Sequence, residues 1–168
     1  MEGNMSNDTG IQDLIISRVL DASLEEAWKA WSDSEYVMQW WGPDCFTSPF
    51  AKIDFREGGK SLVCMSSPQF GDHYNTWEYT KIEPLKEIEY INNLTDHHGN
   101  KIDPLLAGFP ADFPQDQLHT VTFKLIGDNK TEMTVTEHRW PAGKMMELSK
   151  KGMGECLDKL ASIYNKSN

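Results

Sequence analysis

The order of hydrophobic and polar residues first predicts a β-strand near the start of the chain. Residues 11–20 read IQDLIISRVL, in which Leu14, Ile16 and Leu20 share one phase of a two-residue period. Ile15 and Val19 occupy the opposite phase. Such alternation is typical of a strand with one face buried in the core, so we expect one here.

Two short helices are expected to follow this strand. Ser23 begins the stretch SLEEAWKAW, and Glu26 lies three residues later, which is the spacing of a capping box at a helix N-terminus. A second helix is predicted over residues 34–40, because Gly42-Pro43 directly after it prevents continuation. Adjacent helical residues point about 100° apart, so Trp40 and Trp41 should face different directions. We leave two roles open for them, namely packing in the core and lining a pocket.

The rest of the chain alternates apolar segments with turn residues until a final helix. Strands are predicted over residues 46–55, 60–66, 73–82, 86–94, 117–126 and 131–140. Their short connections favour antiparallel hairpins. The exception is the connection 95–117, which contains three prolines and several large apolar residues. It is expected to be either a lid that packs on the domain or a disordered excursion.

A long C-terminal helix is indicated by an apolar stripe that runs from Met145 to Tyr164. A helix of about 20 residues is roughly 30 Å long, which is enough to cross a sheet. We therefore predict an α+β fold in which a curved antiparallel sheet wraps around this helix and the two short helices close one end. Gly152 and Gly154 within the helix indicate either a close approach to the sheet or room for a ligand.

Composition narrows the classes of function. The chain has 16 Lys and Arg against 26 Asp and Glu, a net charge of −10, so neither nucleic acid nor an anionic membrane is an expected partner. No apolar run reaches the roughly 18 residues that a membrane-spanning helix needs, and the first ten residues do not resemble a signal peptide. We expect a cytoplasmic protein with a single domain over residues 11–164 and flexible termini at 1–10 and 165–168.

The cysteines and histidines do not form a metal-binding pattern. Cys45, Cys64 and Cys156 are widely spaced and lack a C-x-x-C pair, so reduced and buried thiols are expected. The histidines are adjacent only at His97 and His98, and no H-E-x-x-H motif is present. We predict no metal and no cofactor.

Four sequence motifs resemble one known family. They are WWGP at 40–43, DFREGGK at 54–60, YTKIEPLKEIEY at 79–90 and GMGECLDKLASI at 152–163. In this order and spacing the chain is similar to bacterial proteins related to the C-terminal domain of the activator of Hsp90 ATPase, within the START-like (SRPBCC) superfamily. The resemblance implies the helix-grip fold, which agrees with the element order read from the residues. It implies no catalytic motif, because these proteins include ligand carriers, enzymes, lipid binders and co-chaperone domains.

Three functions remain open at this stage. The favoured one is binding of a small, largely apolar molecule in a cavity between the curved sheet and the C-terminal helix, since methionine and aromatic side chains suit adaptable pockets. The second is a cyclase-like or hydrolytic enzyme that uses polar groups in that cavity, and the third is an interaction module with an Hsp90-type chaperone as partner. The candidate wall residues are Trp40, Trp41, Trp77, Tyr79, His119, Phe123, Met133, Glu137, Met145 and Met153.

Strand phase brings one candidate pair together. A hairpin turn at residues 127–129 pairs residues whose numbers sum to 256, which places His119 opposite Glu137 on the face expected to point at the helix. The pair is expected to be either an acid/base or ligand-orienting site, with Glu137 raising the proton affinity of His119, or a solvated pair at the end of the sheet.

Overall fold

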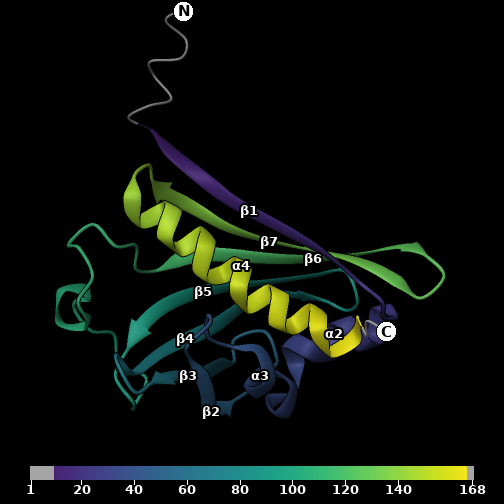
Figure 1. The fold of residues 1–168 in the computed structure, drawn as a ribbon, viewed down its shortest axis with the longest axis horizontal. Helices are drawn as coiled ribbons and strands as arrows, with labels where there is room; N and C mark the ends of the chain where they lie inside the picture. The colour runs from purple at the N-terminus through teal and green to yellow at the C-terminus, as the bar shows by residue number, and fades with distance from the viewer. Residues whose placement is uncertain (1–9, 166–168) are drawn as a thin grey trace, which may run out of the picture.

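The protein folds into one curved antiparallel sheet that carries a long helix on its concave face (Figure 1). The computed structural model describes residues 10–165. Of the flexible ends expected at residues 1–10 and 165–168, all but Gly10 and Asn165 therefore lie outside the described part of the chain. The seven strands are ordered β1-β7-β6-β5-β4-β3-β2. The elements are β1 (Ile11–Leu20), α2 (Leu24–Ser32), α3 (Ser34–Trp40), β2 (Thr47–Lys52), β3 (Lys60–Ser67), β4 (Gly71–Glu83), β5 (Glu87–Thr95), the 3-10 helix η1 (Pro104–Ala107), β6 (Gln117–Gly127), β7 (Lys130–Pro141) and α4 (Lys144–Tyr164).

This architecture confirms the predicted α+β, START-like fold. Helix α4 crosses the sheet, and α2 and α3 lie together near its C-terminal half (Figure 1). The apolar stripe of α4 faces the interior, because its buried side chains are Met153, Cys156, Leu157, Leu160 and Ala161. Burial of this stripe against the sheet, rather than helix propensity, holds α4 in place.

Local sequence signals set the first half of the fold. Leu14, Ile16 and Leu20 of β1 are buried, whereas Ile15 and Val19 are exposed, as the two-residue period predicts. The capping box of α2 is present, because the Ser23 hydroxyl accepts from the backbone N–H of Glu26 and the Glu26 carboxylate accepts from that of Ser23. These contacts satisfy two N–H groups that the first turn of a helix would otherwise leave without partners.

Gly154 of α4 lies against the side chain of Arg18 from β1. The carbonyl of Gly154 accepts from Nη2 of Arg18 at 3.2 Å, and a Cβ at residue 154 would lie 3.4 Å from the same nitrogen. The guanidinium also pairs with Asp158 on the next turn of the helix. A distance of 3.4 Å is an ordinary van der Waals contact, so the two roles expected for Gly154 stay open.

One expectation about the cysteines is wrong. Cys64 and Cys156 are buried free thiols, and burial raises the pKa of Cys156 to about 12. Cys45 is free but exposed. It lies between α3 and β2 with a φ of 78°, in a tight turn that keeps its short side chain away from the core.

Within residues 10–165, no helix combines the length and the apolar character needed to cross a membrane.

Candidate functional site

The concave face of the sheet carries buried polar side chains on its central strands. His119 of β6 lies opposite Glu137 of β7, so the predicted register is confirmed. On the other side, His119 lies opposite Tyr90 of β5. His119 is 4% exposed, Glu137 2% and Tyr90 0%, which excludes the alternative of a solvated pair. Buried polar groups are costly unless they are hydrogen-bonded, so their partners determine what the site can do.

A chain of hydrogen bonds fixes the protonation of His119. Nε2 of Gln117 donates to the carbonyl of His138 at 3.0 Å, which orients the amide and leaves its oxygen as an acceptor. Nε2 of His119 lies 3.0 Å from that oxygen and must therefore carry a proton. Nδ1 then accepts from the Tyr90 hydroxyl at 3.2 Å. Both ring nitrogens are satisfied in the neutral imidazole, and a second proton would remove the bond from Tyr90.

The electrostatics of the pair differ from the expectation. Burial, with a smaller contribution from the charge of His138, lowers the pKa of His119 to about 3. The prediction that Glu137 raises the proton affinity of His119 is therefore wrong. Burial penalises the imidazolium more than the neighbouring carboxyl can offset, because burial also raises the pKa of that carboxyl to about 7 and leaves it mostly uncharged at lower pH.

Glu137 is held by donors from β7 and α4 rather than by His119. Its Oε1 accepts from the indole of Trp140 at 2.8 Å and from the hydroxyl of Ser149 at 3.2 Å. Burial raises the pKa of Glu137 to about 7, although both donors act in the opposite direction. The carboxyl therefore exchanges its proton near neutral pH.

Four tryptophans and Tyr90 form an aromatic cluster between the sheet and the short helices. Trp40 and Trp41 do face different directions, since their rings are 5.9 Å apart and inclined at 84°. Trp40 is 0% exposed and donates to the carbonyl of Ala30 at 2.9 Å, so it packs in the core. Trp41 is perpendicular to Trp77, at 89°, with ring centres 5.3 Å apart. Trp77 also contacts Tyr90, and the centres of these two rings are 5.1 Å apart.

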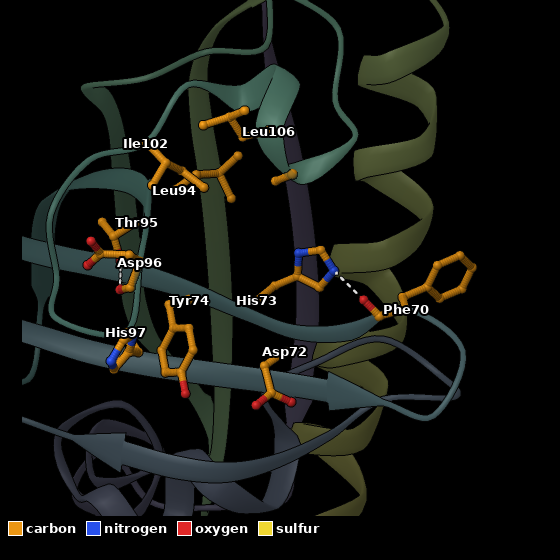
Figure 2. A pocket seen from close by; sticks show the side chains of 11 residues that line it. Phe70, Asp72, His73, Tyr74, Leu94, Thr95, Asp96, His97, Ile102 and Leu106 are labelled. Carbon is orange, nitrogen blue, oxygen red and sulfur yellow. Dashed lines mark hydrogen bonds between the residues drawn. The ribbon is translucent and has the colours of Figure 1, made fainter.

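The larger pocket opens at one end of this interior (Figure 2). It has a volume of about 440 Å3 and lies between the start of β4, the end of β5 and η1. His73 and Leu94 project into it from the strand faces that also carry Asn75 and Trp77 on β4 and Tyr90 on β5. No lysine or arginine lines the pocket; its lining residues are Phe70, Asp72, His73, Tyr74, Leu94, Thr95, Asp96, His97, Ile102, Leu106 and Ala107.

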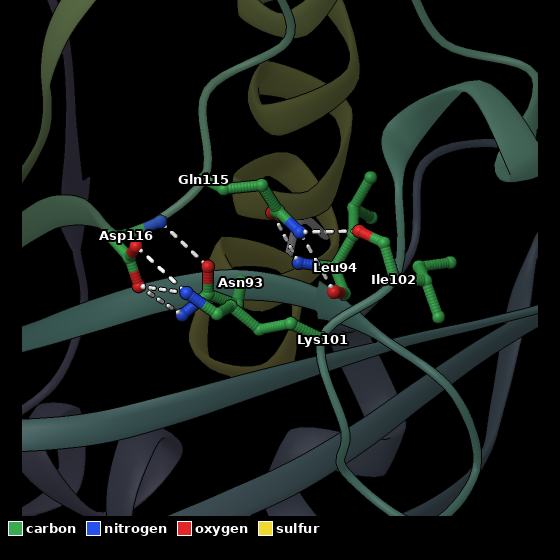
Figure 3. Close-up of polar contacts among 6 residues, drawn as sticks. All are labelled: Asn93, Leu94, Lys101, Ile102, Gln115 and Asp116. Carbon is green, nitrogen blue, oxygen red and sulfur yellow. Dashed lines mark hydrogen bonds and ion pairs between the residues drawn. The ribbon is translucent and has the colours of Figure 1, made fainter.

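The long connection after β5 is ordered and tied to the sheet (Figure 3). The side-chain amide of Gln115 bonds both the N–H and the carbonyl of Leu94, at 2.8 and 3.0 Å, and so extends the hydrogen bonding of β5 where no strand continues. Asp116 accepts from Lys101 at 2.9 Å and from the Asn93 amide at 3.1 Å. These contacts exclude a disordered excursion and leave residues 103–113 as a segment between two anchored ends.

The predicted wall residues are largely interior. Nine of the ten are buried, and neither the larger pocket nor a second one of about 160 Å3 is lined by any of those nine. Met145 is half-buried and lines the second pocket beside Trp140. Trp40, Trp41 and Trp77 come together in the aromatic cluster, whereas the others are spread over the interior. Tyr79 lies against Tyr90, and Phe123 lies against Trp28. The sulfur of Met133 accepts from the Trp31 indole, and Met153 is buried in α4.

Sequence reasoning missed Gln117, Tyr90 and the pocket-lining His73. Gln117 lies two residues before His119 on the same strand, so its phase alone could have placed it on the concave face. Tyr90 required the pairing of β5 with β6, which no turn between neighbouring hairpin strands fixes, because the long connection separates them. Within the described residues, no three His, Cys, Asp or Glu side chains are grouped so that they could hold a metal ion.

The sequence matches the model of one protein family over most of its length. The sequence model of the family described as "Activator of Hsp90 ATPase homolog 1-like protein" matches residues 21–165. The chain belongs to this AHSA1-like family. The match begins after β1 and includes both short helices, the six following strands and α4, so it covers every residue of the polar chain and the pocket.

Solved structures share the fold at low sequence identity. A protein from Chromobacterium violaceum is 20% identical, with a TM-score of 0.74 over 93% of this chain and 99% of that one. A protein from Arthrobacter aurescens is 24% identical, with a TM-score of 0.74 over 90% and 85%. The AHSA1 protein of Silicibacter pomeroyi is 17% identical, with a TM-score of 0.71 over 90% and 96%. No curated protein matches the sequence.

Proposed function

We propose that this AHSA1-like protein binds a small molecule that enters through the larger pocket and reaches the concave face of the sheet beneath α4. The observation that carries the proposal is the pocket itself. Its volume of about 440 Å3 falls in the usual range of roughly 300–1,000 Å3 for ligand sites.

The position of the pocket supports entry at this end. Its floor contains His73 and Leu94, and the same strand faces lead inward to Asn75 and Asn92, whose side chains bond each other at 3.3 Å. A strand rises about 3.3 Å per residue, so Trp77 lies roughly 13 Å along β4 from His73. A ligand of moderate length that entered the pocket would therefore meet amide groups first and the aromatic cluster afterwards.

The rim of the pocket offers apolar contact area. Phe70 is 58% exposed and Leu106 is 81% exposed, and both line the pocket. Exposed apolar groups beside a pocket favour a ligand that is itself largely apolar.

The test is a search for a retained molecule, followed by closure of the pocket. Native mass spectrometry of the full chain purified from its own host should show an added mass. Ala107 lines the pocket on η1, so Ala107→Trp should abolish that mass. Ala111 is exposed in the same connection and does not line the pocket, so Ala111→Trp is the matched control and should retain it. Absence of an added mass in the wild type, or equal retention by both variants, would contradict the proposal.

A further inference from the structure

Two buried indole groups lack hydrogen-bond partners. Among residues 10–165, the buried side-chain nitrogen and oxygen atoms without any partner are Nε1 of Trp41 and Nε1 of Trp77. The other three buried tryptophans are satisfied, by the sulfur of Met133, a backbone carbonyl and the carboxyl of Glu137. Buried donors are almost always paired in native proteins, so two neighbouring indole N–H groups without partners require an explanation.

Contacts within the aromatic cluster give neither N–H a conventional hydrogen bond. An indole N–H can donate weakly to the face of another ring. Trp41 and Trp77 are perpendicular, at 89°, so only one ring of the pair can direct its edge at the face of the other. Trp41 is also nearly perpendicular to Trp40, at 84°, and the ring nearest to Trp77 is Tyr90, at 5.1 Å and 35°. Ring faces are weak acceptors, and neither N–H has a nitrogen, oxygen or sulfur acceptor.

The turn after Trp41 packs towards the larger pocket. Gly42 follows Trp41 and approaches Met65 and Phe46 so closely that a Cβ there would lie 3.2 and 3.0 Å from their Cβ atoms. Met65 lies opposite His73 on the neighbouring strand, and Phe46 stacks on Phe70. Both His73 and Phe70 line the pocket, so the residue after Trp41 packs on side chains that neighbour the pocket lining.

The charges around this route exclude an ion as the natural occupant. The pocket is lined by Asp72 and Asp96 without a lysine or arginine, which disfavours an anion. Lys159, on the nearby helix α4, already donates to two backbone carbonyls, at 3.2 and 3.0 Å. A cation has no lone pair to offer an N–H group. Uncharged acceptors remain, and among them a carbonyl oxygen has two lone pairs, so it can accept from both N–H groups at once.

We infer that Trp41 and Trp77 donate hydrogen bonds to the carbonyl oxygen of an uncharged ligand. The inference rests on the proposed function and adds the chemical class of the ligand, a neutral molecule with an apolar body and a ketone-, ester- or amide-type oxygen. The two N–H groups supply polar contacts that fix the orientation of a ligand beside the aromatic rings.

The experiment compares three probes that differ at one group. Acetophenone, ethylbenzene and benzoate are titrated into the full-length protein labelled with 15N at its tryptophan indoles, and the N–H cross-peaks are followed by NMR. Acetophenone should move the Trp41 and Trp77 cross-peaks downfield, whereas the Trp140 cross-peak, whose N–H is bonded to Glu137, should remain in place. Acetophenone should bind about tenfold more tightly than ethylbenzene, as expected for one well-placed hydrogen bond. Benzoate should bind most weakly.

Variants separate this inference from the proposed function. Trp77→Phe should reduce the affinity for acetophenone by about tenfold and leave that for ethylbenzene unchanged. If ethylbenzene and acetophenone bind in the pocket equally well, or shift both indole cross-peaks alike, the inference is overturned while ligand binding stands. If none of the probes moves any cross-peak, the inference is overturned, and the proposed function is overturned with it only if the native mass spectrum shows no added mass. The wild-type shifts decide the matter even if Trp77→Phe fails to fold.

Discussion

Glu137 and His119 should make the stability of this protein depend on pH in opposite ways. The pKa of Glu137 is raised from 4.5 to about 7, so between these values the folded state keeps a proton that the unfolded chain has released. Stability therefore falls as pH rises through that window. The pKa of His119 is lowered from 6.5 to about 3, so between these pH values the unfolded chain binds a proton that the folded state does not bind. Stability from this group is therefore lost as pH falls from 6.5 towards 3.

The two contributions to the free energy of unfolding overlap between pH 4.5 and 6.5, where one rises with pH as steeply as the other falls, so that they cancel. Each pKa unit corresponds to about 1.4 kcal/mol, so each group changes the free energy of unfolding by about 3 kcal/mol across these two pH units. Glu137→Gln removes the ionisable carboxyl but keeps an oxygen that can accept from Trp140 and Ser149. When the pH falls from 6.5 to 4.5, the free energy of unfolding of Glu137→Gln should therefore decrease by about 3 kcal/mol, whereas that of the wild type should stay nearly constant.

The assay is urea unfolding of both proteins at half-unit steps from pH 4.5 to 8, followed by circular dichroism and tryptophan fluorescence. The difference between the two profiles isolates Glu137, because all other groups contribute equally to both. Glu132→Gln is the control, because it removes a half-buried carboxyl of opposite phase from the same strand and leaves the partners of Glu137 in place. Parallel profiles for Glu137→Gln and the wild type would refute the reasoning that burial keeps this carboxyl protonated.

Three further predictions follow from the packing. Trp40→Phe and Trp77→Phe make the same volume change at two fully buried sites, but only Trp40→Phe removes a hydrogen bond. In urea unfolding, Trp40→Phe should therefore lower the free energy of unfolding by about 1 kcal/mol more than Trp77→Phe does. Equal losses would contradict the finding that the N–H of Trp77 has no partner. Deletion of residues 103–113, between the anchored ends of the connection, should preserve the NMR spectrum of the sheet and accelerate dissociation of the retained ligand, whereas unfolding would show that the segment belongs to the core. Gly154→Leu should displace Arg18 from α4 and lower stability by more than the roughly 1 kcal/mol of helix propensity, and an unchanged melting temperature would rule out this close packing.

Part of the site was readable from the sequence. Strand phase and a hairpin turn were enough to place His119 opposite Glu137, because a two-residue period and a short turn leave one register that buries the apolar face. The direction of their pKa shifts was not readable. It depends on how completely α4 and the aromatic cluster exclude water from the pair, and on whether Gln117, Tyr90, Trp140 or Ser149 reach the polar atoms first.

The sequence by itself determined the order of elements, the buried face of β1, the capping box of α2 and the antiparallel hairpins. These features arise from neighbours a few residues apart, whose geometry the backbone fixes directly. Only the tertiary structure decided that Trp41 and Trp77 meet without acceptors, that the pocket lies at the ends of β4 and β5, and that Gln115 ties the long connection to Leu94. Those contacts join residues far apart in the chain, and their distances depend on how the sheet curves and where α3 and α4 settle against it, which no local pattern of residues specifies.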